Sequence, residues 1–393
     1  MVNKLFQKTP LAWRQLMKEK TRLAIAVAGI TFADMLIFIQ MGFESALFDS
    51  AIQPHRNLQA DLVLINPQFQ TLFSVKSFSR QRLYQALSYD GVESVNFVYI
   101  GTGQWRNSET RIERSILVWG VDPNKPGLQF PEVQKNKDYL KSLNQVMFDQ
   151  ASRPEYGAVG DIFTKTGNFQ TELNSKTVNV KGLFSNGASF ASDGNVIASD
   201  SSFLQLFPSH KPDQIEVGLI NLKPGVDIDQ IKTQLIKGLN PDPKNPFVEV
   251  GTPEDFAQKE KNYWANSTGI GFIFGLGVGV GFIVGIVIVY QILYADVSDH
   301  LPEYATLKAM GYTDNYLLGV LIQEALLLAI LGYLPAFFLS FGLYKLTFAA
   351  TMLPIYMKAN RAVTVFIMTV IMCSISGAIA LRKLRSADPA DIF

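Results

Sequence analysis

The residues that could do chemistry are few in this chain, and they lie far apart. The histidines are His55, His210 and His300, and the single cysteine, Cys373, falls inside an apolar run. Their spacing matches neither HExxH nor another metal-ligand pattern, and no Walker A sequence or G-x-S-x-G elbow occurs. We therefore predict a non-catalytic chain that binds no metal or cofactor of its own.

Two acids, Asp34 and Glu324, interrupt long apolar runs. A carboxylate inside a membrane is costly, so such a residue is a candidate for a functional site. The alternative is a structural hydrogen bond to a neighbouring helix. The sequence favours this structural role for both acids and leaves the functional one open.

The elements that must position these residues are four apolar runs, at 23–43, 268–290, 316–343 and 362–381. Each is long enough for the roughly 20 helical residues that cross a bilayer. The first exceeds the apolar core of a signal peptide, so we expect a retained anchor. The predicted fold class is a multi-pass α-helical membrane protein with four transmembrane helices and a large α+β extracytoplasmic domain between helices 1 and 2.

The two ends of the chain are basic, which predicts that both are cytoplasmic. Residues 1–22 carry Lys and Arg with apolar residues partly on one helical face, as in a helix lying on an anionic membrane surface. A solvated basic tail is the alternative. We expect an inner (plasma) membrane protein with its large domain periplasmic and residues 382–393 as a cytoplasmic tail. Lys345, Lys358 and Arg361 in the short outer loop run against this orientation.

The segment 44–265 is mixed in charge and shows no nucleic-acid footprint. Residue periodicity predicts alternating strands and helices on either side of a Gly-, Asn- and Ser-rich stretch. We interpret 58–121 and 214–250 as two porter-like halves and 122–213 as an inserted subdomain. The expected strands are 58–65, 92–100, 112–121, 215–222 and 247–250, and the expected helices are 80–87 and 227–239.

Glycines recur in the second apolar run at small-xxx-small spacing, which lets helix backbones approach closely. The positions are Gly271, Gly275, Gly277, Gly281 and Gly285. They predict a helix–helix seam. The seam belongs either to a homodimer or to packing within one chain, and the sequence does not decide between the two.

The segment 296–315, between the second and third apolar runs, contains residues that typically begin and end a short helix. Ser298 or Asp299 can cap it, Pro302 suits its first turn, and Gly311 can stop it. Tyr304, Leu307 and Met310 would form apolar knobs. A linker that only joins two transmembrane helices would not need helix-capping and helix-stopping residues. We therefore predict a cytoplasmic coupling helix, with a simple linker as the alternative.

Four stretches in order resemble the MacB/FtsX/LolC-type ABC transporter permeases. They are LAWRQLMKEKTRLAIAVAGI (11–30), DVSDHLPEYATLKAMGYTDNYL (296–317), Glu324 with the two residues after it, and ADPADIF (387–393). The ending and the YATLKAMGY form look most like the DevC group, the permease of a cyanobacterial exporter associated with heterocyst glycolipids. Unlike MacB, this sequence carries no ATPase.

The resemblance implies mechanotransmission in a tripartite efflux system. Its parts would be a homodimer in the lipid membrane, two copies of a separate ABC ATPase carrying ATP and Mg²⁺, a periplasmic membrane-fusion adaptor and a TolC-like outer-membrane channel. The residues implied to contact the ATPase are Asp299, Glu303, Tyr304, Leu307, Lys308, Met310 and Gly311. The alternative is an FtsX-like regulator of a periplasmic cell-wall enzyme, without transport. The cargo, glycolipid by resemblance, cannot be read from the residues.

Overall fold

The computed structural model describes residues 13, 17–125, 127–189, 192–303, 306 and 310–386. The chain divides into two compact units. The helical unit comprises Met1–Ala46, Ile270–Ala350 and Ile355–Phe393, and the sheet unit comprises Leu47–Gly269 and Thr351–Pro354. Most of the predicted surface helix at 1–22 and all of the closing stretch 387–393 lie outside the described residues.

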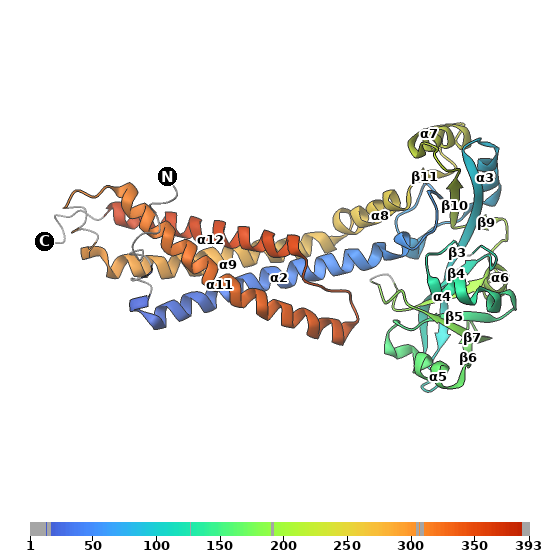
Figure 1. Ribbon diagram of the computed structural model, residues 1–393, viewed down its shortest axis with the longest axis horizontal. Helices are drawn as coiled ribbons and strands as arrows, with labels where there is room; N and C mark the ends of the chain where they lie inside the picture. The colour runs from blue at the N-terminus through green and yellow to red at the C-terminus, as the bar shows by residue number, and fades with distance from the viewer. Residues whose placement is uncertain are drawn as a thin grey trace. The chain divides into compact units, whose positions relative to one another are not determined.

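Long helices form the helical unit: α2 (Lys20–Arg56), α9 (Gly269–Asp299), α11 (Asp314–Thr351) and α12 (Ala359–Ser386), labelled in Figure 1. Each contains a stretch long and apolar enough to cross a membrane. At about 1.5 Å per residue, the 37 residues of α2 exceed the roughly 30 Å of a hydrocarbon core. The sequence predicted a first span at 23–43 because apolarity ends there, whereas the helix continues through polar residues to Arg56.

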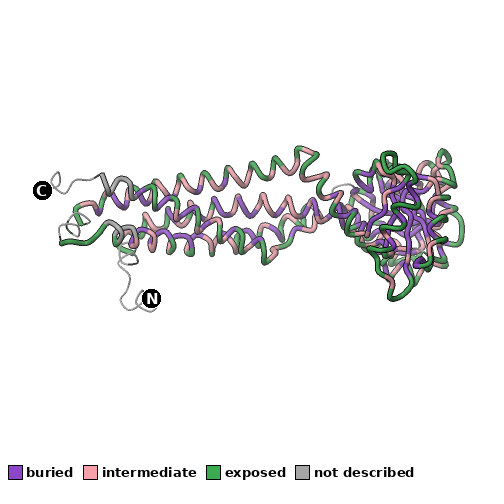
Figure 2. Tube along the Cα trace, turned by 90° about the horizontal axis from the view of Figure 1, so that it is seen from above, coloured by how far each residue is buried: buried purple, intermediate pink, exposed green. Residues whose placement is uncertain are grey.

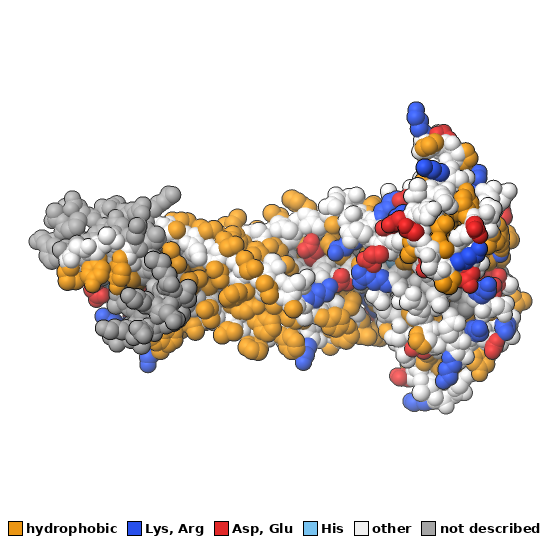
Figure 3. Space-filling model, turned by 45° about the horizontal axis from the view of Figure 1, so that its top comes forward, with side chains coloured by type: hydrophobic (Ala, Val, Ile, Leu, Met, Phe, Trp, Pro, Cys, Tyr) orange, Lys and Arg blue, Asp and Glu red, His pale blue; other side chains and the backbone are white. Residues whose placement is uncertain are grey.

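Hydroxyl groups tie these helices together. Thr31 Oγ1 in α2 donates to the carbonyl of Gly332 in α11 at 3.0 Å, and Ser376 Oγ in α12 donates to Ile286 in α9 at 2.9 Å. Such bonds suit an apolar surrounding, where water cannot satisfy polar groups. The outward side chains are mostly apolar, as the orange surface of the helices in Figure 3 shows.

The sheet unit is built on one nine-stranded sheet in the order β11-β1-β10-β3-β4-β8-β5-β7-β6. Long β3 pairs antiparallel with β10 up to Val98 and with β4 from Val98 onward, so it runs through both parts of the sheet. A separate pair joins β2 (Phe78–Ser79) and β9 (Gln214–Ile215). The strands of the large sheet are β1 (Leu62–Ile65), β3 (Val92–Arg106), β4 (Glu113–Val121), β5 (Gln145–Asp149), β6 (Phe169–Leu173), β7 (Lys176–Phe184), β8 (Asn195–Ser199), β10 (Val217–Leu222) and β11 (Glu249–Gly251).

The stretch 122–213, predicted as an inserted subdomain, does not form a sheet of its own. Its strands β5 to β8 continue the main sheet, with β8 pairing parallel to β4 from Leu117↔Asn195 to Val121↔Ser199. Periodicity identifies a strand but says nothing about its partner. Pairing with β4 covers an edge that would otherwise carry open hydrogen-bonding groups.

Short helices cover the sheet, and alternation along each strand divides the apolar side chains between two cores. Leu62 and Leu64 pack in one core, and Val63 and Ile65 in the other. Figure 2 shows this buried interior in purple. The helices are α3 (Arg80–Gln85), α4 (Pro131–Asn136), α5 (Val159–Thr166), α6 (Asp200–Leu206), α7 (Ile228–Leu239) and α8 (Pro253–Asn262), with 3-10 turns η2 (Leu72–Ser74), η3 (Ala86–Ser88), η4 (Lys137–Lys141) and η5 (Pro154–Tyr156) and a π-turn η6 (Tyr263–Ser267).

Candidate functional site

The segment between α9 and α11 is described in part. Residues 301–303 and 306 are helical, Thr306 Oγ1 donates to the carbonyl of Pro302 at 2.8 Å, and Met310 N donates to Thr306 O at 3.0 Å. Gly311 follows with φ of 94°, a left-handed conformation that ends a helix and favours glycine. Glu303 is exposed, and Met310 exposes 63% of its surface. Tyr304, Leu307 and Lys308 lie outside the described residues.

Ser298 and Asp299, the predicted caps of this segment, lie at the end of helix α9, which continues to Asp299. Ser298 Oγ donates back to the carbonyl of Tyr294 at 2.7 Å. The Asp299 carboxylate accepts from Arg22 Nη2 of α2 at 2.5 Å. Arg22 also pairs with Glu19 at 2.9 Å. A cross-helix ion pair therefore holds the end of α9 next to the segment.

The two intramembrane acids are fully buried, but they differ in their partners. Asp34 Oδ1 accepts from Thr369 Oγ1 of α12 at 2.9 Å, which is a structural bond of the kind that the sequence favours. Glu324 faces the carboxyl of Asp296, and within the described residues neither of its oxygens has a hydrogen-bond donor. Two facing carboxyls repel each other strongly when both are charged.

The glycines of α9 divide between two surroundings. Gly277 lies against Gln40, Gly281 against Ile37 and Gly285 against Met372, all from helices of the same chain. A side chain at Gly275 would meet nothing within 4 Å. Packing within one chain therefore uses three of the five seam residues. A dimer seam stays a prediction for the face that contains Gly275.

A cavity of about 660 Å³ opens in the sheet unit beside the turn between β3 and β4, a volume in the range of ligand pockets. Its lining mixes apolar side chains such as Ile112 with charges of both signs, including Arg114 and Glu155. Among the described residues, the lining contains neither histidine nor cysteine. A lining with apolar side chains and charges of both signs does not indicate one class of ligand.

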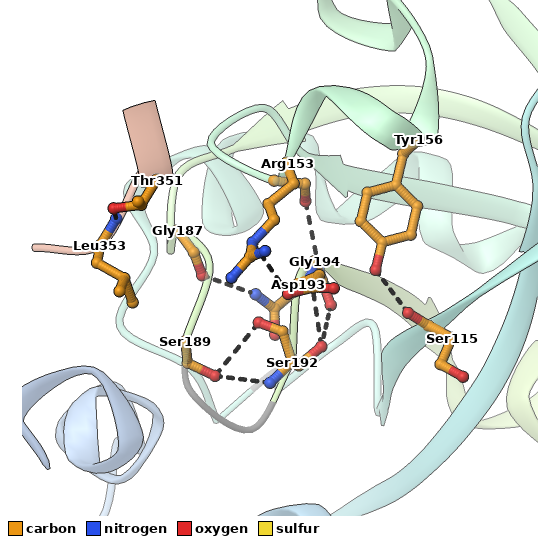
Figure 4. A network of polar contacts seen from close by, with 12 residues as sticks. Ser115, Arg153, Tyr156, Gly187, Ser189, Ser192, Asp193, Gly194, Thr351 and Leu353 are labelled. Carbon is orange, nitrogen blue, oxygen red and sulfur yellow. Dashed lines mark hydrogen bonds and ion pairs between the residues drawn. The ribbon is translucent and has the colours of Figure 1, made fainter. Parts of the chain in front are cut away.

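The wall of this cavity is held by the network in Figure 4, in which Arg153 reaches Asp193 and Tyr156 turns toward Ser115. Arg153 Nε lies 3.0 Å from Asp193 Oδ1, and the Tyr156 hydroxyl donates to Ser115 O at 2.5 Å. Burial raises the pKa of Tyr156, so its hydroxyl keeps its proton and serves as a donor. These contacts hold Arg153, a residue of the lining, in place.

The spacing of the histidines predicted no metal or catalytic site, yet two of them pair with glutamates, His55 in a buried pair and His210 in a partly buried one. His55 Nε2 lies 2.8 Å from Glu260 Oε2, and His210 Nε2 lies 2.9 Å from Glu216 Oε1. The hydrogen bond to Glu216 raises the pKa of His210, against the opposing effect of burial. No sequence signal could reveal the first pair, because its partners are 205 positions apart. Within the described residues, no group of three or more His, Cys, Asp and Glu could hold a metal ion.

Comparisons with known proteins bear mainly on the helical unit. Residues 275–389 match the family model described as FtsX-like permease C-terminal, and no curated protein matches the chain. Similar solved structures include the periplasmic region of MacB from Actinobacillus actinomycetemcomitans, with 12% identity, TM-score 0.37, and 53% of this chain and 95% of that chain covered. The extracellular domain of the noncanonic ABC-type transporter YknZ from Gram-positive bacteria has 16% identity, TM-score 0.35, and 49% and 99% covered.

A domain of a putative permease protein from Porphyromonas gingivalis is a third similar structure, with 12% identity, TM-score 0.29, and 50% of this chain and 88% of that chain covered. At these identities and TM-scores the structural matches do not decide what this chain does. The family match is the informative one. It covers most of α9, all of α11 and α12, and the segment between α9 and α11, which makes the C-terminal part of this chain similar to FtsX-like permeases.

Proposed function

We propose that this chain is the permease subunit of an ABC-type exporter, acting as a homodimer with two copies of a separate ATPase. ATP and Mg²⁺ would be held by that ATPase. Its motion would pass through the segment 299–311 into the spans and on to the sheet unit on the periplasmic side. The sheet unit would push cargo through a membrane-fusion adaptor into a TolC-like channel.

The observation that carries this proposal is the segment between α9 and α11, inside the region that matches FtsX-like permeases. It presents a 63% exposed methionine, Met310, directly before the turn at Gly311. Its start is held by the ion pair of Asp299 with Arg22. An exposed apolar side chain on a segment fixed to two helices can seat in a groove of a partner and transmit a push.

The charge distribution of this segment supports a protein partner. Glu303 is exposed in the helical part, and Met310 is exposed at the end of the segment. Interfaces commonly place apolar anchors such as methionine at the centre and charges at the rim. The resemblance to the DevC group makes glycolipid the proposed cargo.

The test is a reconstitution of the full chain with the ATPase that co-purifies with it. We expect Met310→Asp and Glu303→Lys to insert normally and to abolish stimulation of ATP turnover, because a charge cannot seat in an apolar groove and a reversed charge repels the rim. Leu143→Asp is the matched control, since Leu143 is a 59% exposed leucine of the sheet unit. The proposed function would be refuted if both segment variants stimulated ATP turnover normally. It would also be refuted if no ATPase co-purified with the full chain.

The regulator remains the second candidate, because the FtsX-like family match fits it equally well. A pull-down with the tagged full chain separates the two. A membrane-fusion adaptor in the eluate supports export. A cell-wall hydrolase or its activator supports regulation, and the mechanical role of the segment would be the same in both cases.

A further inference from the structure

A buried polar cluster lies where α2 and α8 end inside the sheet unit. His55 occupies the last turn of α2 and Glu260 the last turn of α8 (helices labelled in Figure 1). Their side chains are 0% and 1% exposed, and Nε2 of His55 lies 2.8 Å from Oε2 of Glu260. Charged groups are almost never buried to this degree unless they are paired, so the contact is a specific feature of this joint.

The Glu260 carboxylate joins more than these two helices. Its Oε2 also accepts from the backbone N–H of Leu72 in η2 at 3.0 Å, and its Oε1 accepts from Trp264 Nε1 in η6 at 3.2 Å. One side chain therefore connects α2, η2, α8 and η6. We call His55, Leu72, Glu260 and Trp264 the Glu260 clasp.

The surroundings keep water away from the clasp. The His55 ring meets Phe69 edge to face at 5.7 Å between centroids, and Phe69 meets Phe256 of α8 in the same way at 5.8 Å. Because Leu72 and Trp264 donate to the two carboxylate oxygens of Glu260, we assign the proton of the His55–Glu260 contact to Nε2 of His55. His55 Nδ1 has no hydrogen-bond partner within the described part of the chain. In a dry site such bonds are strong and costly to break.

Helix α8 is itself fastened to the sheet. Lys259 forms an ion pair with Glu249 of β11, and Asp255 pairs with Lys232 of α7 at 2.5 Å. Thr252 and Asp255 cap the start of α8 reciprocally. A contact that holds α2 to α8 therefore also holds α2 to the sheet.

We propose that the Glu260 clasp is the positioning element that makes the α2 and η6 connections of the sheet unit move as one. The chain passes between the units at these two connections, within α2 at Ala46/Leu47 and just after η6 at Gly269/Ile270, and again on either side of the short stretch Thr351–Pro354. Without the clasp, the end of α2 could slide along α8 and a movement of the spans would be lost at this joint. This inference rests on the proposed function, since it concerns how the sheet unit receives motion.

The sheet unit contains its own matched control. His210 and Glu216 form the same kind of pair at 2.9 Å, and Ile100 N donates to Glu216 Oε2 at 3.0 Å, as Leu72 N does to Glu260. Neither residue lies on a helix that leads to the helical unit: His210 follows α6, and Glu216 lies between β9 and β10. A purely structural role for the two His–Glu pairs predicts the same behaviour at both sites, although the His210 side chain is 16% exposed.

The experiment uses the full chain in lipid nanodiscs with its co-purified ATPase and the non-hydrolysable analogue AMP-PNP. Hydrogen exchange is followed in the helical and the sheet unit. In the wild type and in His210→Ala, we expect nucleotide to change exchange in both units. In His55→Ala and Glu260→Gln, we expect the last turn of α2 to exchange about tenfold faster or more, because a charge-assisted bond is lost, and the response of the sheet unit to nucleotide to disappear.

His55→Gln is the rescue variant, because its amide can still donate to Glu260 and should restore part of the response. If Glu260→Gln does not fold, Trp264→Phe, which removes one donor of the half-buried indole, carries the test with His55→Ala. A normal sheet-unit response in the folded clasp variants overturns the inference. Met310→Asp separates the two proposals. If nucleotide still changes hydrogen exchange in both units of this variant, the proposed function fails. If nucleotide changes neither unit in Met310→Asp but changes both units in the clasp variants, only the clasp is refuted.

Discussion

The two units differ in how many hydrogen-bond donors surround a buried acid. Asp149 in the sheet unit accepts from Asn195 Nδ2 and from the backbone N–H groups of Ala151, Asn186 and Gly187, all at 2.9 to 3.0 Å. Glu324 in the helical unit is equally buried and, within the described residues, meets no donor. Burial still raises the pKa of Asp149, although each of its four donors acts against this.

The comparison teaches that burial alone does not define a role. Asp149 organises a turn, because its carboxylate satisfies three backbone N–H groups that would otherwise be left unpaired. Within the described residues, Glu324 satisfies no donor, so we expect it to contribute little to the stability of the fold. The comparison therefore predicts that removal of Asp149 destabilises the protein, whereas removal of Glu324 does not.

The largest expected effect is that of Asp149→Ala. It leaves three backbone donors without their acceptor, and at roughly 1–3 kcal/mol each the loss should exceed about 3 kcal/mol of unfolding free energy. Thermal unfolding of the purified chain measures it. Asp161→Ala, at an exposed acid in α5, is the control and should change little. Equal melting temperatures of Asp149→Ala and Asp161→Ala would show that the buried carboxylate of Asp149 does not stabilise the sheet unit.

A smaller effect is expected from Gly285→Leu in α9, where an added side chain would overlap Sδ of Met372. Overpacking typically costs about 1–3 kcal/mol. Gly275→Leu is the matched control, since its position is open, and it should keep the monomer stable. If Gly275 lies in a dimer seam, that variant instead shifts the protein from dimer to monomer in native mass spectrometry. Equal destabilisation by both variants would contradict the division of the glycines.

The pair of His210 with Glu216 should give a pH-dependent effect on the order of 1 kcal/mol. Because the pKa of His210 is raised above 6.5 in the folded protein, the stabilisation is complete below about pH 6.5 and is lost as pH rises through the higher folded value. Melting of the wild type and of Glu216→Gln between pH 5.5 and 8.5 checks this. Parallel pH profiles would show that the pair does not titrate in this range.

The smallest effect on stability is predicted for Glu324→Leu. Replacing a buried acid that has no donors with an apolar residue of similar size should leave unfolding within about 1 kcal/mol of the wild type, or raise stability. Stimulation of the partner ATPase should nevertheless fall if the acid serves another state. A large loss of stability would place Glu324 in the same class as Asp149.

Local features of the fold could be predicted from the sequence. The apolar runs predicted α9, α11 and α12, and the helix expected at 227–239 is α7, with the Asp227 side chain as its N-cap. The stop at Gly311 also has the backbone conformation that glycine favours. These features depend on neighbours within a few positions, which is why a pattern reveals them.

Only the tertiary structure decided which distant segments meet. It joined His55 to Glu260, placed β8 beside β4, and set Gly285 against Met372 while leaving Gly275 open. Periodicity fixes which face of an element is apolar, but many partners can cover that face equally well. Which partner covers the face depends on packing and on the pairing of buried polar atoms. Both involve residues far apart in the chain, so no single stretch of sequence determines them.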